Sequence, residues 1–460
     1  MNDSRVKFFC FISILLLAVF CFNGQVMRLG TLPVQQKIAV GEPLDLGFQD
    51  PHKFLSALKV DIKTENELIM MYQGLPFKDS NFTLMESTPV VNSPGKVEMN
   101  VKLFGLIPLR QVTVDVVPQK KVMPGGQSIG VLLHSKGVIV VGISEVEDAT
   151  GKQDAPANKA GIKIGDVILK INGEEIESEQ QMRSLVNKSG MTGKPIRVQL
   201  MRQGKTMNVK VDPVYCKDTN SYRLGLFIRD TAAGIGTLTF YEPETSVYGA
   251  LGHMITDAET GQRMELPDGK VIEATVQQIH PGQRGQPGEK VGLIKNQTSL
   301  SGTIEKNTPY GIFGQLSQPI TNPFFDEPIP VALSHQIKEG PAEIITVLNG
   351  DKMEKFKINI DKVSSQTNPE GKGMIIRITD PKLLEITGGI IQGMSGSPII
   401  QYTQQGDAVL VGAVTHVFIN DPTSGYGVLA EWMLNESSTV RAKKNINVSR
   451  VKRVIYDNCA

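Results

Sequence analysis

Short runs that alternate apolar and polar residues, each ended by glycine or proline, recur along most of this 460-residue chain. Alternation with a period of two is typical of strands that bury one face, and glycine and proline mark the turns between them. Because the chain also has 45 glycines and only brief helical patterns, we predict a mainly β fold. A single core rarely serves more than about 250 residues, so we expect several domains.

The charged residues give no electrostatic case for nucleic acid as a partner. Lysine and arginine number 48 and aspartate and glutamate number 47, which leaves a net charge of +1. We expect no metal and no other cofactor, because the chain has no C-x-x-C pair and no H-E-x-x-H motif. Cys216 and Cys459 are compatible with one disulfide outside the cytoplasm or with two free thiols, and the sequence leaves both open.

The N-terminus, residues 1–23, carries an export signal. Arg5 and Lys7 precede an apolar run from Phe8 to Phe22. A basic flank before such a run directs export and keeps the basic end in the cytoplasm. The run is short for a membrane span, which takes about 20 residues, but no small-x-small cleavage site follows it. We therefore favour a retained signal anchor over a cleaved signal peptide, and expect the chain to contact the membrane through it.

The next segment, residues 24–117, is predicted to be a small β-rich spacer domain. Its clearest alternating runs are K-V-E-M-N-V-K-L-F from Lys96 and V-T-V-D-V-V from Val112. Prolines interrupt the other runs, and no residue pattern in the segment points to chemistry.

Residues 118–214 have a different pattern. The run A-P-A-N-K-A-G-I-K-I-G-D-V-I-L-K-I-N-G starts at Ala155, and a helical pattern at 178–188 and a strand at 196–201 follow it. This order resembles a PDZ domain, a fold that adds an extended peptide to a sheet edge and holds its carboxylate with backbone N–H groups of a glycine-containing loop.

The resemblance to a PDZ domain implies peptide termini as partners. It places the carboxylate-binding loop at Ser128, Ile129, Gly130 and Val131. Taken without the resemblance, these four residues only begin a strand, in a domain that binds no free terminus.

Residues 217–460 hold the strongest chemical signal, G-M-S-G-S-P from Gly393 to Pro398. It resembles the G-D-S-G-G-P motif of trypsin-like serine peptidases, in which a glycine-flanked turn exposes the serine and aims backbone N–H groups at the developing oxyanion. The match makes Ser395 the nucleophile and gives the oxyanion-hole N–H groups to Gly393 and Ser395. The short strands with turn signals in this block indicate a sandwich or barrels, and the resemblance to trypsin-like peptidases implies a double β-barrel. Met394 replaces the aspartate that pairs with a new N-terminus in activated zymogens, so activation by that route is in doubt.

A serine nucleophile needs a base and a group that orients the base. His253 precedes Ser395 by about 140 residues, which matches the trypsin-like order, whereas the rival His416 follows the serine. Two acids are plausible as the third member, Asp380 in R-I-T-D-P and Asp257 just after His253.

The order of anchor, spacer, PDZ domain and G-M-S-G-S-P block resembles the stage IV sporulation protein B family along nearly the whole chain. The motif A-L-G-H-x-I-x-D around His253 and the position of Asp380 match that family as well. The resemblance therefore implies a serine endopeptidase with a triad of Ser395, His253 and Asp380.

The same resemblance implies a place and a substrate. The place is the forespore membrane of an endospore-forming bacterium, with the enzyme facing the intermembrane space. The substrate is a membrane-bound regulator, whose cleavage frees an intramembrane protease to process pro-sigma-K. The chain would also cut itself near the N-terminus, which releases a soluble form. Two alternatives remain: a general envelope quality-control protease, which usually has its peptidase before the PDZ domain, and a PDZ adaptor with an inactive peptidase block.

Overall fold

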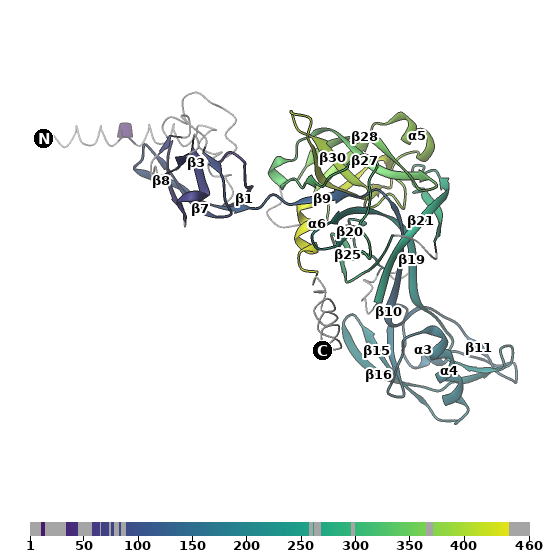
Figure 1. Ribbon diagram of the computed structural model, residues 1–460. Coiled ribbons are helices and arrows are strands. Elements are labelled where there is room, and N and C mark those ends of the chain that lie inside the picture. Colours follow the sequence, from purple (N-terminus) through teal and green to yellow (C-terminus); the bar gives the residue numbers. More distant parts are fainter. Residues whose placement is uncertain are drawn as a thin grey trace, which may run out of the picture. The chain divides into compact units, whose positions relative to one another are not determined.

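The computed structural model divides the chain into two units, residues 1–120 and residues 121–460 (Figure 1). The residues that it describes are 11–13, 34–44, 58–64, 66–72, 75–77, 82–83, 89–256, 261, 268–295, 300–364 and 371–440. Within these ranges, no helix is both long and apolar enough to span a membrane. Most of the predicted anchor, residues 1–23, lies outside them, so the anchor stays a prediction.

The first unit is built from short strands, as the alternating runs predict. One sheet has the order β1-β8-β7-β2-β5, from strands Gln35–Ala39, Ile107–Val117, Gly95–Leu103, Leu58–Thr64 and Phe82–Thr83. A second has the order β4-β3-β6, from Leu75–Pro76, Met70–Tyr72 and Val90–Val91, and the 3-10 helix η2 spans Glu67–Ile69. Along β7, Val97, Met99 and Val101 are fully buried, so one face of the pleat forms the core.

Two long antiparallel strands organise the second unit. These are β10, Ser128–Ile143, and β19, Leu226–Glu242, which pair from Ser128–Thr237 at one end to Ile143–Leu226 at the other. Figure 1 shows both strands running from the part that contains α3 and α4 into the part that contains β20 and β25. A single sheet in the order β16-β15-β13-β10-β19-β20-β25-β24 therefore runs through the PDZ and peptidase regions.

The PDZ region packs two helices against one end of this sheet. Its main elements are α3 Pro156–Lys159, β13 Val167–Ile171, α4 Glu179–Gly190, β15 Ile196–Arg202 and β16 Lys205–Val211; the shorter ones are β11 Val146–Glu147, β12 Gln153–Asp154, β14 Glu174–Glu175, β17 Val214–Cys216 and β18 Ser221–Arg223. The predicted helix at 178–188 is confirmed as α4, whose N-cap Ser178 accepts a hydrogen bond from the Gln181 N–H at 3.2 Å. The buried carboxylate of Asp166 accepts from the Lys163 N–H at 2.8 Å and pairs with Arg202 at 2.6 Å.

The first half of the peptidase region shares the large sheet. Its further elements are β9 Lys121–Pro124, β20 Val247–Ala250, β21 Asp268–His280, β22 Glu289–Ile294, β23 Ser301–Thr303, β24 Lys306–Thr308, β25 Gly311–Gln315, β26 Ile329–Pro330 and the 3-10 helix η3 Ser334–Gln336. We predicted two closed barrels. In this half β21, β10, β19, β20 and β25 pair in that order, and β23 pairs with the other edge of β21. A bridge between Gly302 of β23 and Leu316 just after β25 joins the two ends, so the strands form a ring, from which β10 and β19 continue into the PDZ region.

The second half is the closed barrel that the sequence predicts. Its six strands have the order β27-β28-β29-β32-β31-β30, from Gly340–Asn349, Lys352–Val363, Met374–Ile378, Asp421–Leu429, Ala408–Phe418 and Pro398–Tyr402. Helix α5, Pro381–Thr387, follows β29, and α6, Ala430–Ser437, follows β32. Apolar side chains such as Ile344, Phe356 and Val414 fill the barrel. The turn that carries Ser395 enters this barrel at β30.

Candidate active site and peptide groove

The serine motif forms a turn at residues 393–398, which we call the nucleophile turn. It is tied to β19 of the other half. The buried Thr237 hydroxyl donates to the carbonyl oxygen of Gly393 at 2.8 Å, and the Thr237 N–H donates to the carbonyl oxygen of Ser395 at 3.0 Å. The position of Ser395 is therefore fixed by contact between the two halves of the peptidase region.

Two glycines of the nucleophile turn adopt backbone angles that suit only glycine. Gly393 has φ of +89° and Gly396 has φ of +91°. A Cβ atom on Gly396 would lie 2.0 Å from the carbonyl oxygen of Thr237, and one on Gly393 would lie 3.0 Å from Cβ of Lys290. The Thr239 hydroxyl also donates to the carbonyl oxygen of Gly396 at 2.8 Å. Both positions therefore require glycine, because their φ angles are positive and because a Cβ atom would clash with neighbouring atoms.

The N–H groups assigned to the oxyanion hole are unpaired. In the part of the chain that the structure describes, the N–H groups of Gly393 and Ser395 donate no hydrogen bond, whereas that of Met394 between them donates to Ile391 at 3.1 Å. A developing oxyanion needs N–H groups that nothing else has taken, beside the serine that attacks.

A cavity of about 870 Å³ contains the candidate catalytic side chains. Ser395, His253 and His416 all line it, together with residues of β10 and β19. His253 follows β20 and His416 lies on β31, so the two halves of the peptidase region each contribute a histidine. Within the described ranges, no cluster of three or more His, Cys, Asp or Glu side chains could hold a metal ion.

The ring of His253 is oriented by the backbone. Its Nδ1 lies 2.8 Å from the carbonyl oxygen of Met254. A carbonyl oxygen can only accept, so Nδ1 carries the proton and Nε2 keeps its lone pair. Burial lowers the pKa of His253, and the hydrogen bond to Met254 offsets this in part. A neutral imidazole with an unprotonated Nε2 is the form that a general base requires.

His416 is brought beside His253, although the sequence order had set it aside. The two ring centroids are 5.0 Å apart, with the planes tilted by 46°. Burial, followed by repulsion from His253 and Lys372, lowers the pKa of His416 to about 4. His416 is therefore neutral near pH 7 and adds no charge beside His253.

Asp380 is not hydrogen-bonded to His253. It is the N-cap of α5, where its carboxylate accepts from the N–H groups of Leu383 and Lys357, each at 3.2 Å. The alternative acid, Asp257, lies outside the described residues. Among the residues whose placement is known, the hydrogen-bond partner of His253 Nδ1 is thus a carbonyl oxygen and no carboxylate.

The predicted carboxylate-binding loop, Ser128–Val131, lies away from any free sheet edge. These residues belong to β10 within the peptidase half, where Gly130 pairs with Ile235 of β19 on one side and Ile272 of β21 on the other. Val131 lines the cavity of Ser395. With strands on both sides, the backbone of this segment offers no edge to which a peptide could add.

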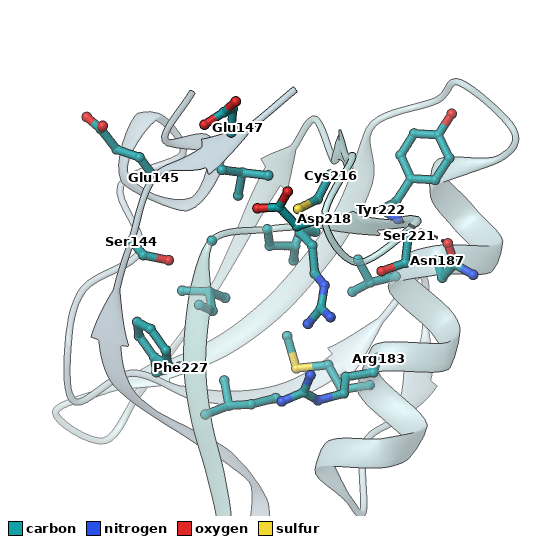
Figure 2. A pocket seen from close by; sticks show the side chains of 18 of the residues that line it. Ser144, Glu145, Glu147, Arg183, Asn187, Cys216, Asp218, Ser221, Tyr222 and Phe227 are labelled. Atoms are coloured by element: carbon teal, nitrogen blue, oxygen red, sulfur yellow. Dashed lines mark hydrogen bonds between the residues drawn. The ribbon is translucent and has the colours of Figure 1, made fainter. Parts of the chain in front are cut away.

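An open groove lies instead between α4 and the first residues of β19. Its volume is about 730 Å³, and Arg183 of α4 and Phe227 of β19 both line it (Figure 2). Met182 of α4 lines it as well. β19 pairs with β10 along one edge here, and no described strand pairs with its other edge before Leu238. An unpaired strand edge beside a helix is the arrangement in which a peptide adds as a further strand.

The sequence did contain a signal for this groove. L-G-L-F-I at 224–228 is a glycine followed by an apolar strand, and Gly225 has φ of +69°. The segment was missed because it lies beyond residue 214, where the predicted PDZ domain ended, and was counted as peptidase.

Two family models match the chain. Residues 220–434 match the SpoIVB peptidase S55 model, and residues 125–212 match a PDZ domain. Among solved structures, a protease of M. tuberculosis in its active form matches with a TM-score of 0.26 at 16% identity, covering 46% of this chain and 76% of that one.

Curated relatives are serine proteases. The chain is 43% identical over 53 residues to the serine protease Do-like HtrB of Bacillus subtilis, 12% of each chain. It is 30% identical over 152 residues to a probable periplasmic serine endoprotease DegP-like of Pseudomonas putida, 32% of this chain and 29% of that one. The chain thus spans less than a third of either relative. With the family matches, these comparisons show that residues 220–434 are similar to the SpoIVB peptidase S55 family and that residues 125–212 are similar to PDZ domains.

Proposed function

We propose that Ser395 is the nucleophile of this endopeptidase and His253 its general base, with the N–H groups of Gly393 and Ser395 as the oxyanion hole. One observation carries the proposal: the N–H groups of Gly393 and of Ser395 itself are unpaired, and Ser395 shares a cavity with His253, a histidine whose Nε2 is unprotonated.

The steps follow from these groups. Ser395 Oγ attacks the carbonyl carbon of the scissile peptide bond, and its proton passes to Nε2 of His253. The oxyanion accepts hydrogen bonds from Gly393 and Ser395. When the C–N bond breaks, His253 returns the proton to the leaving amine. A water molecule, deprotonated by His253, then hydrolyses the acyl-enzyme.

The third catalytic member is tested separately. The family resemblance assigns it to Asp380, but that carboxylate would have to leave Leu383 and Lys357 to reach His253. An Asp380→Asn variant keeps one oxygen to cap α5 and removes the charge. A loss of activity without a loss of stability would support Asp380, and wild-type activity would leave the Met254 carbonyl as the orienting group.

The biological role is proposed from the family match. We propose that the enzyme is held at the forespore membrane by its N-terminal segment and faces the intermembrane space. There it cuts a membrane-bound regulator, which starts intramembrane processing of pro-sigma-K, and it releases itself by self-cleavage. The SpoIVB peptidase match over 220–434 supports this role.

The groove beside α4 is proposed to hold peptides. An extended peptide would add to the free edge of β19, with apolar side chains against Met182 and Phe227. This site recruits substrate or receives a regulatory terminus, and it replaces Ser128–Val131 in that role.

The experiment uses the full chain as wild type and as Ser395→Ala, followed by intact mass over time and by labelling with a fluorophosphonate–rhodamine probe. Labelling and N-terminal trimming in wild type alone would support the proposal. If neither protein reacts, the adaptor alternative replaces it. Complete digestion of unfolded casein without sequence preference would favour the quality-control alternative.

A further inference from the structure

Lys290 is a lysine buried beside the nucleophile turn. It lies on β22 and is 5% exposed, and its Nζ donates to the fully buried Thr346 hydroxyl of β27 at 2.7 Å. Among the described residues, no carboxylate forms an ion pair with it. Burying an amine without a counter-charge destabilises a fold, so this position needs a physical explanation.

The stem of Lys290 packs directly against the oxyanion hole. The Lys290 N–H donates to the carbonyl oxygen of Gln392 at 2.9 Å, and the Gln392 N–H donates to Gly288 at 2.8 Å. A Cβ atom on Gly393 would meet Cβ, Cγ and Cδ of Lys290 at 3.0–3.1 Å. Lys290 therefore contacts the residue whose N–H is proposed to bind the oxyanion.

Ser397 of the nucleophile turn is a second buried polar residue in this part of the barrel. The β27–β30 register pairs Ile344 with Ile399, and continued by two residues it sets Thr346 opposite Ser397. The Ser397 hydroxyl is fully buried and has no hydrogen-bond partner within the described structure. An ammonium has three N–H donors and Lys290 Nζ uses one of them, so two donors remain. The Ser397 hydroxyl can both accept and donate a hydrogen bond.

Three glutamates on the surrounding strands have partners of their own. These pairs are His280 with Glu289, Tyr402 with Glu343, and Lys382 with Glu354. Side chains alternate between the two faces of a strand. Glu289 therefore lies on the face of β22 opposite Lys290, and Glu343 lies on the face of β27 opposite Thr346. Burial alone therefore lowers the pKa of Lys290, to about 7.

We propose that Lys290 is a positioning residue of the oxyanion hole: its stem fixes Gly393, and the positive charge of its amine favours the negatively charged tetrahedral intermediate. This rests on the proposed roles of Ser395 and Gly393. The charge is lost as the pH rises through about 7. His253 must be neutral to act, and its pKa is lowered from 6.5. As the pH is raised, the rate should therefore increase with a midpoint below pH 6.5 and then decrease as the pH passes about 7.

The test compares the labelling rate of the full chain by the fluorophosphonate probe from pH 5 to 9, together with the thermal midpoint. Lys290→Met has nearly the same shape and no charge. We expect it to unfold at the same or a higher temperature, to label about tenfold more slowly at pH 6.5, and to lack the decline near pH 7. Lys295→Met is the control, because Lys295 follows the same strand but is ion-paired with Glu273 and Asp351.

A purely structural role predicts a different result, in which Lys290→Met loses stability and rate together and keeps the wild-type pH profile. That result overturns the proposal, as does an unchanged rate. If Lys290→Met does not fold, Thr346→Val removes only the acceptor of the amine. It should move the decline to lower pH, and an unmoved decline contradicts the proposal. An unlabelled wild type would instead overturn the proposed function, and this inference with it.

Discussion

The hydroxyl of Thr237 holds the nucleophile turn, so Thr237→Val is the sharpest test of how Ser395 is positioned. Valine keeps the shape of the buried side chain and removes the 2.8 Å hydrogen bond to Gly393. A buried carbonyl that loses its partner costs about 1–3 kcal/mol of the free energy of unfolding. If the turn relaxes by about 1 Å, the rate falls by as much as 10²-fold. We therefore expect a modest loss of stability and a much larger loss of labelling by the fluorophosphonate probe.

Two measurements on the full chain separate these effects, urea unfolding for stability and the probe labelling rate for the site. Thr275→Val is the matched control, since its hydroxyl makes a bond of the same length, 2.8 Å, to Asp351 outside the nucleophile turn. Equal labelling rates for Thr237→Val and the control would refute the reasoning, because the turn would then hold its geometry without the hydroxyl.

Three further predictions concern other parts of the second unit. Asp166→Ala should lower the free energy of unfolding by roughly 2 kcal/mol, because Arg202 and the Lys163 N–H lose a buried carboxylate; urea titration measures it, and no change would contradict the assigned role. Phe227 is 60% exposed, so Phe227→Glu should fold normally and label normally while losing at least tenfold in affinity for a library of free C-terminal peptides, measured by fluorescence polarisation. The acid limb of the labelling rate should lie below pH 6.5, because burial lowers the pKa of His253 and the neutral base persists to lower pH; a limb at or above 6.5 would count against His253 as the base.

The sequence predicted those features that depend on neighbouring residues. The helix at α4, the strand at β15 and the glycine-bounded turn at Ser395 each follow from local chemistry, and the structure has all three. The Asp380-Pro pair also had a local meaning that was overlooked, because an N-cap aspartate followed by proline at the first helical position begins a helix.

Features that depend on register between distant strands could not be predicted. Ser128–Val131 pairs with residues about a hundred positions away in β19 and more than a hundred away in β21. No periodicity within a strand specifies which partner it takes. The boundary near residue 214 stays a prediction, and β10 and β19 each have residues in both regions.

This shared strand gives the two sites a fixed spacing. Phe227 in the groove and Thr237 at the nucleophile turn lie on β19, ten residues apart, which corresponds to roughly 33 Å of extended chain. In most pairs of domains a flexible linker would set that distance, but here β10 hydrogen-bonds to β19 over most of the interval. A substrate that occupied the groove and the cavity together would therefore need about ten extended residues between its docking and cleaved segments. The fixed length of β19 between the two sites, and not the motion of a hinge, would then determine which substrates fit.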